Sequence, residues 1–271
     1  MAVTEKTELA DILAYGVDLK NRRIYFGVNL DVGDVDSSTE FSMSSVEYAV
    51  RALHRMASDA PGKPIEIHMN SEGGDAYAML RLYDEIRSCP CQVKFFGSGS
   101  VCSAATWIMA GCDERYLHIN TTVMVHDGSE GFDGKHTDSQ IYAEEMKRLQ
   151  SLLCQIYAEN SRMPAEFWLD ISQRDTYLTA SEAVSLGLAD KVLEPKKRGN
   201  LRKMRQHQMK KEVDPKEFKQ LVKSIYKRIG RIEVPKIELN EPAKELSDPH
   251  LTIAVDPLPA VDPPKEEMPK V

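Results

Sequence analysis

The sequence has no long apolar run, and its few cysteines do not form a recognisable pattern. Each of these absences excludes a class of protein. The longest candidate for a membrane span, 104–110, is far shorter than the ~18 residues that a membrane-spanning helix needs. The five cysteines are odd in number and have no repeating spacing, which is not the pattern of a disulfide framework. Cys89 and Cys91 have no second Cys or His pair that would complete a zinc site. We therefore expect free thiols, no bound metal and no membrane span.

The N-terminal residues also lack the basic stretch and apolar run of a signal peptide, so we expect a cytoplasmic protein, or one in the host cytoplasm if the gene is viral. A net charge of −7 disfavours a protein that binds nucleic acid over its whole surface. The 271 residues are 42% hydrophobic, which is enough for one large domain with appendages.

Apolar periodicity predicts strands that alternate with helices along most of the chain. The expected strands are 24–26, 64–69, 91–96, 116–117, 123–125 and 189–193, and the expected helices are 44–56, 75–87, 102–111, 138–160 and one that begins at Pro164. We expect a polar loop over 31–42, and turns at 70–74 and 97–100, where glycine and serine gather. Such alternation indicates an α/β fold with a largely parallel sheet.

A further helix is predicted between Thr179 and Gly187, and it has clear signals at both ends. Thr179 followed by Glu182 three residues later is typical of a capping box, and Gly187 is a typical helix end. Pro195 closes the domain that these elements form.

The composition changes after Pro195. Residues 196–211 are strongly basic, and Asp214 followed by Pro215 predicts the start of an amphipathic helix. Eight of the 14 prolines fall in residues 235–271, so we expect that tail to be disordered. The basic run has no interleaved aromatic residues, which makes nucleic acid an unfavoured partner.

Four features could belong to a catalytic site, although each of them also has an ordinary structural explanation. Ser103 stands between a turn and an apolar helix, where a serine commonly caps the helix. His126 follows an apolar strand, and Asp175 lies in an Arg-Asp turn. The pair Gly73-Gly74 could present backbone N–H groups to a developing negative charge, or simply form a tight turn. A catalytic serine needs a base, an orienting acid and such an oxyanion site.

Five segments, in this order, resemble the proteolytic subunit of the Clp protease, ClpP, and the resemblance covers residues 22–194. The segments are 67–74 (IHMNSEGG), 100–105 (SVCSAA), 115–126 with its end VMVH, 131–138 (GFDGKHTD) and 174–192 with its start RDTYLTASEA. The resemblance implies an α/β, ClpP/crotonase-like spiral of strand–strand–helix units, with a long protruding handle helix over 138–160. It also allows a phage-encoded ClpP-like protein.

The same resemblance implies a catalytic triad. Ser103 would be the nucleophile, His126 the general base, and Asp175 the group that orients the imidazole. Backbone N–H groups of Gly74 and Ala104 would form the oxyanion hole. An extended substrate peptide would pair with the strand formed by Gly131, Phe132, Asp133, Gly134, Lys135 and His136.

The implied activity is that of a serine endopeptidase that cuts unfolded proteins inside a chamber. Its implied partners are further copies of this chain, in stacked heptameric rings, and an AAA+ unfoldase that feeds in substrate. Hydrolysis itself would need no metal, nucleotide or organic cofactor.

Two departures from the family pattern lie close to the triad, and several alternatives remain open. Glu72 replaces a proline before the double glycine, and Asp127-Gly128 replaces Gln-Pro after the histidine. Asp127 could perturb His126 or point away. The alternatives are a phage head-maturation protease that cuts scaffold or capsid protein, a crotonase-type acyl-CoA enzyme, and a non-catalytic ring subunit. A Ser–Lys dyad would need Lys135, whose position in the substrate strand favours a surface role.

We expect four parts in the chain. These are a flexible N-terminal segment (1–20), the peptidase domain (21–195), a basic segment with an amphipathic helix (196–232) and a Pro-rich tail (233–271). Because the catalytic segments all end before Pro195, we expect residues 196–271 to be dispensable for peptide hydrolysis and to matter for the choice of partner.

Overall fold

The computed structural model describes residues 12, 15–27, 40–128, 135, 138–195 and 214–230. All of them belong to one compact unit, residues 1–241. The strands are β1 (Val17–Asp18), β2 (Arg23–Phe26), β3 (Glu40–Phe41), β4 (Ile65–Ser71), β5 (Gly73–Gly74), β6 (Val93–Cys102), β7 (Glu114–His118), β8 (Thr122–Val125), β9 (Thr176–Thr179) and β10 (Lys191–Leu193). The helices are α2 (Met43–Asp59), α3 (Ala76–Arg87), α4 (Ala105–Gly111), α5 (Ser139–Glu159), α6 (Ala165–Ser172), α7 (Ala180–Leu186) and α8 (Pro215–Arg228).

Within the described residues, the main sheet has eight strands and is largely parallel, as the alternation of strands and helices predicts. Its path runs β1-β2-β4-β6-β7-β10, with β8 paired to β6 and β9 paired to β8. The pairs β1–β2 and β8–β9 are antiparallel, and the other pairs in this sheet are parallel. A second, two-stranded sheet joins β3 to β5.

Strand β6 corrects two of the predicted boundaries. The predicted turn at 97–100 is wrong, because β6 continues to Cys102, and α4 therefore begins at Ala105 rather than at 102. The glycines let the strand change partner: residues 94–97 pair with β7, whereas residues 100–102 pair with β8. Gly99 has a φ of +66°, and a Cβ there would lie 2.4 Å from Oδ1 of Asn70. Turn-forming residues thus bend a strand here rather than end it.

Other boundaries differ from the sequence predictions by shorter distances. Within the predicted turn at 70–74, β4 continues to Ser71 and Gly73-Gly74 form β5. Part of the predicted polar loop over 31–42 forms β3, and the rest of it up to residue 39 lies outside the described residues. The last strand begins at Lys191 instead of 189.

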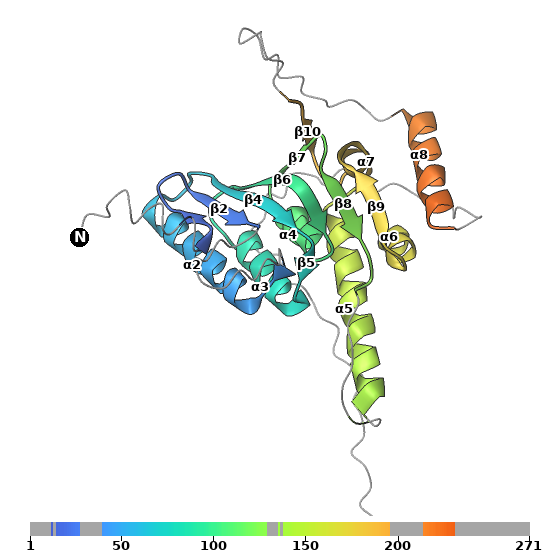
Figure 1. The fold of residues 1–271 in the computed structure, drawn as a ribbon, viewed down its shortest axis with the longest axis horizontal. Helices are drawn as coiled ribbons and strands as arrows, with labels where there is room; N and C mark the ends of the chain where they lie inside the picture. Colours follow the sequence, from blue (N-terminus) through green and yellow to red (C-terminus); the bar gives the residue numbers. More distant parts are fainter. Residues whose placement is uncertain are drawn as a thin grey trace, which may run out of the picture. The chain divides into compact units, whose positions relative to one another are not determined.

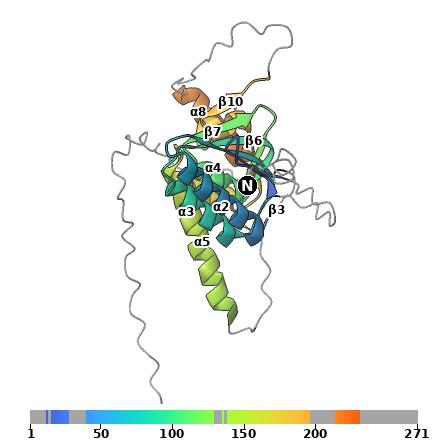
Figure 2. The same ribbon diagram turned by 90° about the vertical axis from the view of Figure 1, so that its left-hand side faces the viewer.

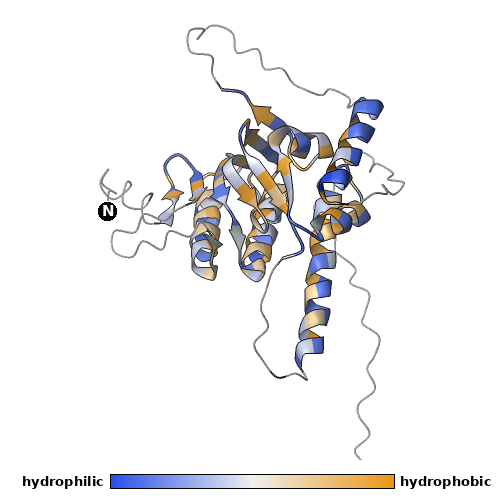
Figure 3. Ribbon diagram, turned by 45° about the vertical axis from the view of Figure 1, so that its right-hand side comes forward, coloured by the Kyte–Doolittle hydropathy of each residue, from blue (hydrophilic) through white to orange (hydrophobic). Residues whose placement is uncertain are grey.

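Helices α2, α3 and α4 lie on the same face of the sheet (Figure 1, Figure 2). The apolar stripe predicted for 44–56 is the buried face of α2, and it consists of Val46, Ala49, Val50, Leu53 and Met56. The strands contribute alternate residues to this core, as β4 shows with buried Ile65, Ile67 and Met69. Figure 3 shows the same concentration of hydrophobic residues in the central strands.

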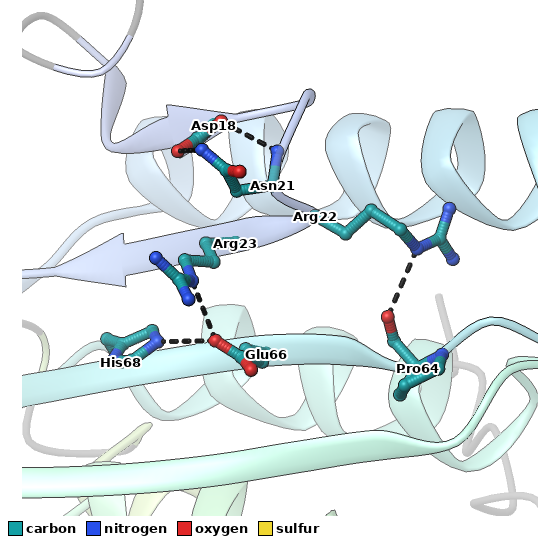
Figure 4. Close-up of polar contacts among 7 residues, drawn as sticks. All are labelled: Asp18, Asn21, Arg22, Arg23, Pro64, Glu66 and His68. Atoms are coloured by element: carbon teal, nitrogen blue, oxygen red, sulfur yellow. Dashed lines mark hydrogen bonds and ion pairs between the residues drawn. The ribbon is translucent and has the colours of Figure 1, made fainter.

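The other face of the sheet is half-exposed and carries polar and aromatic side chains. Figure 4 shows Glu66 of β4 accepting a hydrogen bond from Arg23 Nε at 2.7 Å and lying 3.0 Å from Nε2 of His68. The ring of His68 stacks between those of Tyr25 and Phe96, with centroids 5.0 Å away on each side. Cross-strand pairs of this kind stabilise the pairing of neighbouring strands.

The entry to β2 is anchored by two further contacts drawn in Figure 4. Asp18 accepts hydrogen bonds from the backbone N–H and the side-chain amide of Asn21, at 2.9 and 2.8 Å. Arg22, at a φ of 57°, donates from Nε to the carbonyl of Pro64 at 3.1 Å. The chain therefore turns sharply between β1 and β2 and is tied to the start of β4.

The long helix α5 has two different halves. Its buried residues begin at Leu149 and continue to Tyr157, whereas Ile141 in the first half is 68% exposed. In Figure 1 the first half of α5 extends beyond the other helices. Within the described residues, no helix is long and apolar enough to cross a membrane.

The C-terminal helices have the predicted caps. Thr179 and Glu182 form the predicted capping box of α7, and Gly187 ends that helix in the left-handed conformation, at a φ of 80°. Asp214 caps α8, and Pro215 occupies its first turn. These local signals are reliable because a cap satisfies backbone groups that the helix itself leaves unpaired.

Candidate active site

Ser103 follows β6 and precedes α4, in a backbone conformation that few non-glycine residues adopt. Its φ is 52°, in the left-handed region, and its N–H donates to the carbonyl of Met124 at 2.7 Å. The helix-capping role is not what the structure shows, because Ala104 occupies the N-cap of α4 without a side-chain hydrogen bond. This sharp strand-to-helix turn instead presents the hydroxyl of Ser103 at the end of the sheet.

His126 reaches Ser103 because their strands are parallel neighbours. Cys102 at the end of β6 is paired with Met124 in β8, so the residues after both strands emerge at the same edge of the sheet. Nε2 of His126 lies 2.6 Å from Oγ of Ser103, and the histidine side chain is only 16% exposed. This is the distance of a strong hydrogen bond between a hydroxyl and a potential general base.

Asp175 meets the other side of the imidazole through the antiparallel pairing of β8 with β9. Val125 is paired with Thr176, so the residues one step beyond this pair, His126 and Asp175, also face each other. Oδ1 of Asp175 lies 3.4 Å from Nδ1 of His126, and the aspartate side chain is 59% exposed. The contact is longer than a good hydrogen bond. Hydrogen bonds between catalytic groups often shorten only when a substrate binds.

A buried chain of hydrogen bonds holds the backbone of Ser103. Oγ1 of Thr106 donates to the carbonyl of Ser103 at 2.6 Å. Because that donation uses the threonine proton, the hydroxyl of Tyr157 must donate to Thr106 across their 2.5 Å contact. The same hydroxyl accepts from Nε1 of Trp107 at 2.7 Å. Burial raises the pKa of Tyr157, which keeps the phenol protonated and able to donate.

These three supporting residues were missed by the sequence analysis. Trp107 and Tyr157 lie in α4 and α5, which the apolar pattern predicts as helices, although α4 begins later than predicted. The polar atom of a buried Trp or Tyr needs a partner, which is the one signal that could have been noticed. Nothing in the sequence says that these partners are each other.

The double glycine lies against the serine. A Cβ on Gly73 would come within 2.6 Å of Cβ of Ser103, and a Cβ on Gly74 within 2.4 Å of the backbone of Phe41. Both have positive φ, at 113° and 143°. The N–H of Gly73 donates to Oγ of Ser71 at 3.1 Å. Directly after Ser103 in the chain, fully buried Ala104 is the N-cap of α4, and the backbone N–H groups at the start of a helix have no partner within the helix.

The thiol next to the serine is not a competing nucleophile. Burial, with a further contribution from the charge and hydrogen bond of Glu72, raises the pKa of Cys102 to about 12. A thiol reacts as its thiolate, so Cys102 is inert near neutral pH. Glu72, which departs from the family pattern, thus lies beside Cys102. All five cysteines are free, as their spacing predicts.

Asp127, the other departure, is exposed. Burial raises the pKa of Cys154 to about 11, and the charge of Asp127 adds to this rise. Asp127 therefore lies close enough to α5 for its charge to act on Cys154.

Most of the predicted substrate strand lies outside the described residues. Of residues 131–136, only Lys135 is described: it is exposed, and its carbonyl accepts a hydrogen bond from the N–H of Asp138 at 2.9 Å. No group of three or more His, Cys, Asp or Glu side chains that could hold a metal occurs in the described part of the chain.

A comparison with known families matches this arrangement to one of them. Residues 22–196, more than half of the chain, match the family model described as Clp protease. The chain belongs to the Clp protease family. The match confirms the resemblance to ClpP and supports a peptidase of the serine type. The matched range of the Clp protease family contains Ser103, His126 and Asp175, and it ends before α8.

Proposed function

We propose that this Clp protease family member is a serine endopeptidase with Ser103, His126 and Asp175 as its catalytic triad. The observation that carries the proposal is the 2.6 Å distance between Nε2 of His126 and Oγ of Ser103. The left-handed backbone conformation of Ser103, at the turn between β6 and α4, adds support. So does the position of Asp175 on the opposite side of the imidazole.

In the proposed mechanism, Oγ of Ser103 attacks the carbonyl carbon of a peptide bond while Nε2 of His126 takes the hydroxyl proton. Asp175 holds the imidazole in the productive tautomer and stabilises the imidazolium that forms. The imidazolium then gives its proton to the leaving amine, which leaves an acyl-enzyme on Ser103. Water attacks this ester with His126 again as the base, which releases the acid product and restores the hydroxyl.

The developing negative charge on the carbonyl oxygen needs donors that are already in place. We assign this role to the backbone N–H groups of Gly74 and Ala104. The double glycine adopts a backbone conformation that other residues avoid, which suits its N–H groups to face an anion. Ala104 begins a helix, where backbone N–H groups have no partner within the helix and can bind an anion. Residues 131–136 would hold the peptide as an added strand.

We further propose that the protein works as a ring-shaped homo-oligomer in which α5 is the handle helix. The first half of α5 contributes no buried residue to the single chain and carries an isoleucine that is 68% exposed, so a second copy could pack against it. Because the chain belongs to the Clp protease family, we also propose that the rings are stacked heptamers. We propose that an AAA+ unfoldase feeds them with unfolded protein substrates.

We propose the domain division 1–20, 21–195, 196–232 and 233–271. The end of β10 at Leu193 supports the boundary at 195, and α8 lies within the third part. Of the first part, Val17 and Asp18 join the main sheet through β1.

Replacement of the nucleophile tests the proposed reaction. Ser103→Ala should reduce hydrolysis of a short fluorogenic peptide by several orders of magnitude, because one triad member is lost. Ser98→Ala, which changes an exposed serine of the same strand, should leave the rate unchanged. Hydrolysis by Ser103→Ala at the parent rate would refute the proposal. Peptide hydrolysis that depends on Ser103 would also exclude a crotonase-type enzyme and a non-catalytic ring subunit.

A further inference from the structure

Helix α8 lies beyond the part of the chain that matches the Clp protease family, yet it packs onto the same unit. Its apolar stripe is buried: Phe218 is 9% exposed, Val222 5%, and both Ile225 and Tyr226 0%. In Figure 3 its visible side is hydrophilic. An amphipathic helix buries such a stripe against a specific surface.

Contacts from α8 reach α6, β9 and α7. The ring of Tyr226 packs on Phe167 of α6 with centroids 5.9 Å apart, and its hydroxyl donates to Asp170 of α6 at 3.3 Å. Arg228 donates to the carboxylate of Glu182 in α7 at 2.8 Å and to the carbonyl of Tyr177 in β9 at 3.4 Å. One helix thus contacts three consecutive elements.

Asp175 lies in the short link between two of these elements. Helix α6 ends at Ser172 and β9 begins at Thr176, so α8 contacts the chain on both sides of the link. Among the described strands, β9 pairs with β8 alone, so no described strand pairs with its other edge. Arg228 of α8 donates to a carbonyl of β9. This contact supplements the pairing with β8, which binds β9 along one edge.

Glu182 connects the two sets of contacts. One carboxylate oxygen accepts hydrogen bonds from the N–H and the hydroxyl of Thr179, at 2.8 and 3.0 Å, and so holds the end of β9. The other oxygen accepts from Arg228 of α8. The capping box that ends β9 is therefore also an anchor for α8.

We propose that α8 positions Asp175 for catalysis by holding α6, β9 and α7 in place around it. This proposal rests on the proposed triad. Asp175 is exposed and lies 3.4 Å from His126, so its own contact with the imidazole does little to fix the link. Ile225, Tyr226 and Arg228 are positioning residues in this account. The proposal replaces the expectation that the whole of residues 196–271 is dispensable for peptide hydrolysis.

The test compares Ile225→Asp with Ser224→Asp in the full-length protein. Both changes place an aspartate on α8, but Ile225 is fully buried against the rest of the unit and Ser224 is exposed. We expect Ile225→Asp to lower kcat on a short peptide on the order of 10- to 100-fold, because small displacements of a catalytic group are costly. KM should change little, and Ser224→Asp should match the parent.

A double variant separates positioning from a general loss of structure. If α8 acts through Asp175, adding Ile225→Asp to Asp175→Asn should lower kcat no further than Asp175→Asn alone. An equal fold-loss in both backgrounds would overturn the proposal, as would a parent-like kcat for Ile225→Asp. If Ile225→Asp does not fold, Arg228→Ala takes its place with Lys227→Ala as its control. Arg228→Ala should lower kcat about two- to fivefold, as expected for the loss of an exposed ion pair, whereas Lys227→Ala should leave kcat unchanged. Arg228→Lys should recover part of the loss.

The outcomes also separate this proposal from the proposed function. If Ser103→Ala stays active, the triad itself is wrong. If Ser103→Ala is inactive while neither Ile225→Asp nor Arg228→Ala changes kcat, the triad stands and only the role of α8 is refuted.

Discussion

A methyl group on Gly73 would lie 2.6 Å from Cβ of Ser103, so no residue with a side chain fits between β5 and the turn after β6. The φ of Gly73, 113°, also disfavours every other residue. The double glycine therefore allows a close approach of two backbones at the proposed nucleophile, beyond its role as a flexible turn.

Gly73→Ala should displace Ser103 and lower the rate of peptide hydrolysis by at least about tenfold. It should also lower the free energy of unfolding by about 1–3 kcal/mol through backbone strain. Gly62→Ala separates the two effects, because Gly62 has a φ of 80° but a methyl group added there would meet no atom within 4 Å. That control should lose stability and keep its activity. If Gly73→Ala retains full activity, the close approach has no role in catalysis.

Tyr157→Phe should weaken the support of Ser103 by removing one hydroxyl. Nε1 of Trp107 would lose its acceptor and Thr106 its donor, inside the core, at a cost of about 1–3 kcal/mol in stability. We expect a lower kcat with little change in KM, measured beside thermal unfolding. Tyr48→Phe, at a tyrosine that is 45% exposed, should change neither quantity. Parent-like kcat and stability in Tyr157→Phe would contradict the proposed support.

Asp175→Asn should lower kcat on the order of 10²- to 10³-fold, less than the ~10⁴-fold found where the triad acid is buried, because Asp175 is 59% exposed. The fold should be retained, as circular dichroism would show. The matched control is Asp127→Asn, an exposed carboxylate next to His126 in the chain, which should be near-neutral. If the two variants exchange these results, Asp127 rather than Asp175 orients the imidazole.

Ile141→Asp should impair assembly if the first half of α5 is buried between subunits. Because Ile141 is 68% exposed in the single chain, the change should not disturb the fold of the chain. Light scattering should show a large assembly for the parent and for Gln140→Asp, and a smaller species for Ile141→Asp. A parent protein that is monomeric at micromolar concentration would refute the proposed ring.

The sequence predicts the fold best where a local rule decides it. The capping box of Thr179 and Glu182 is read correctly because both partners lie three residues apart on one turn. The predicted turn at 97–100 is wrong because glycine marks both turns and bends in strands, and only the partners β7 and β8 distinguish them. Long-range pairing is the information that a single local pattern lacks.

The same limit applies to the candidate site. Ser103, His126 and Asp175 could be proposed together only through a family resemblance, since their meeting depends on the register of β6, β8 and β9. The contact of Tyr157 with Thr106 joins residues 51 positions apart and has no local signature. The apolar stripe of α8 predicts that the helix packs on something, but not that its partner includes the strand that follows Asp175.

Reaction with a fluorophosphonate tests the central claim most directly, because the reagent phosphonylates a serine that a neighbouring base activates, with loss of fluoride. Mass spectrometry of the labelled, digested protein should place the adduct on Ser103 in the parent. Labelling should disappear in Ser103→Ala and slow markedly in His126→Ala. An adduct on another serine, or none on a folded and assembled protein, would contradict the proposed nucleophile and with it the proposed function.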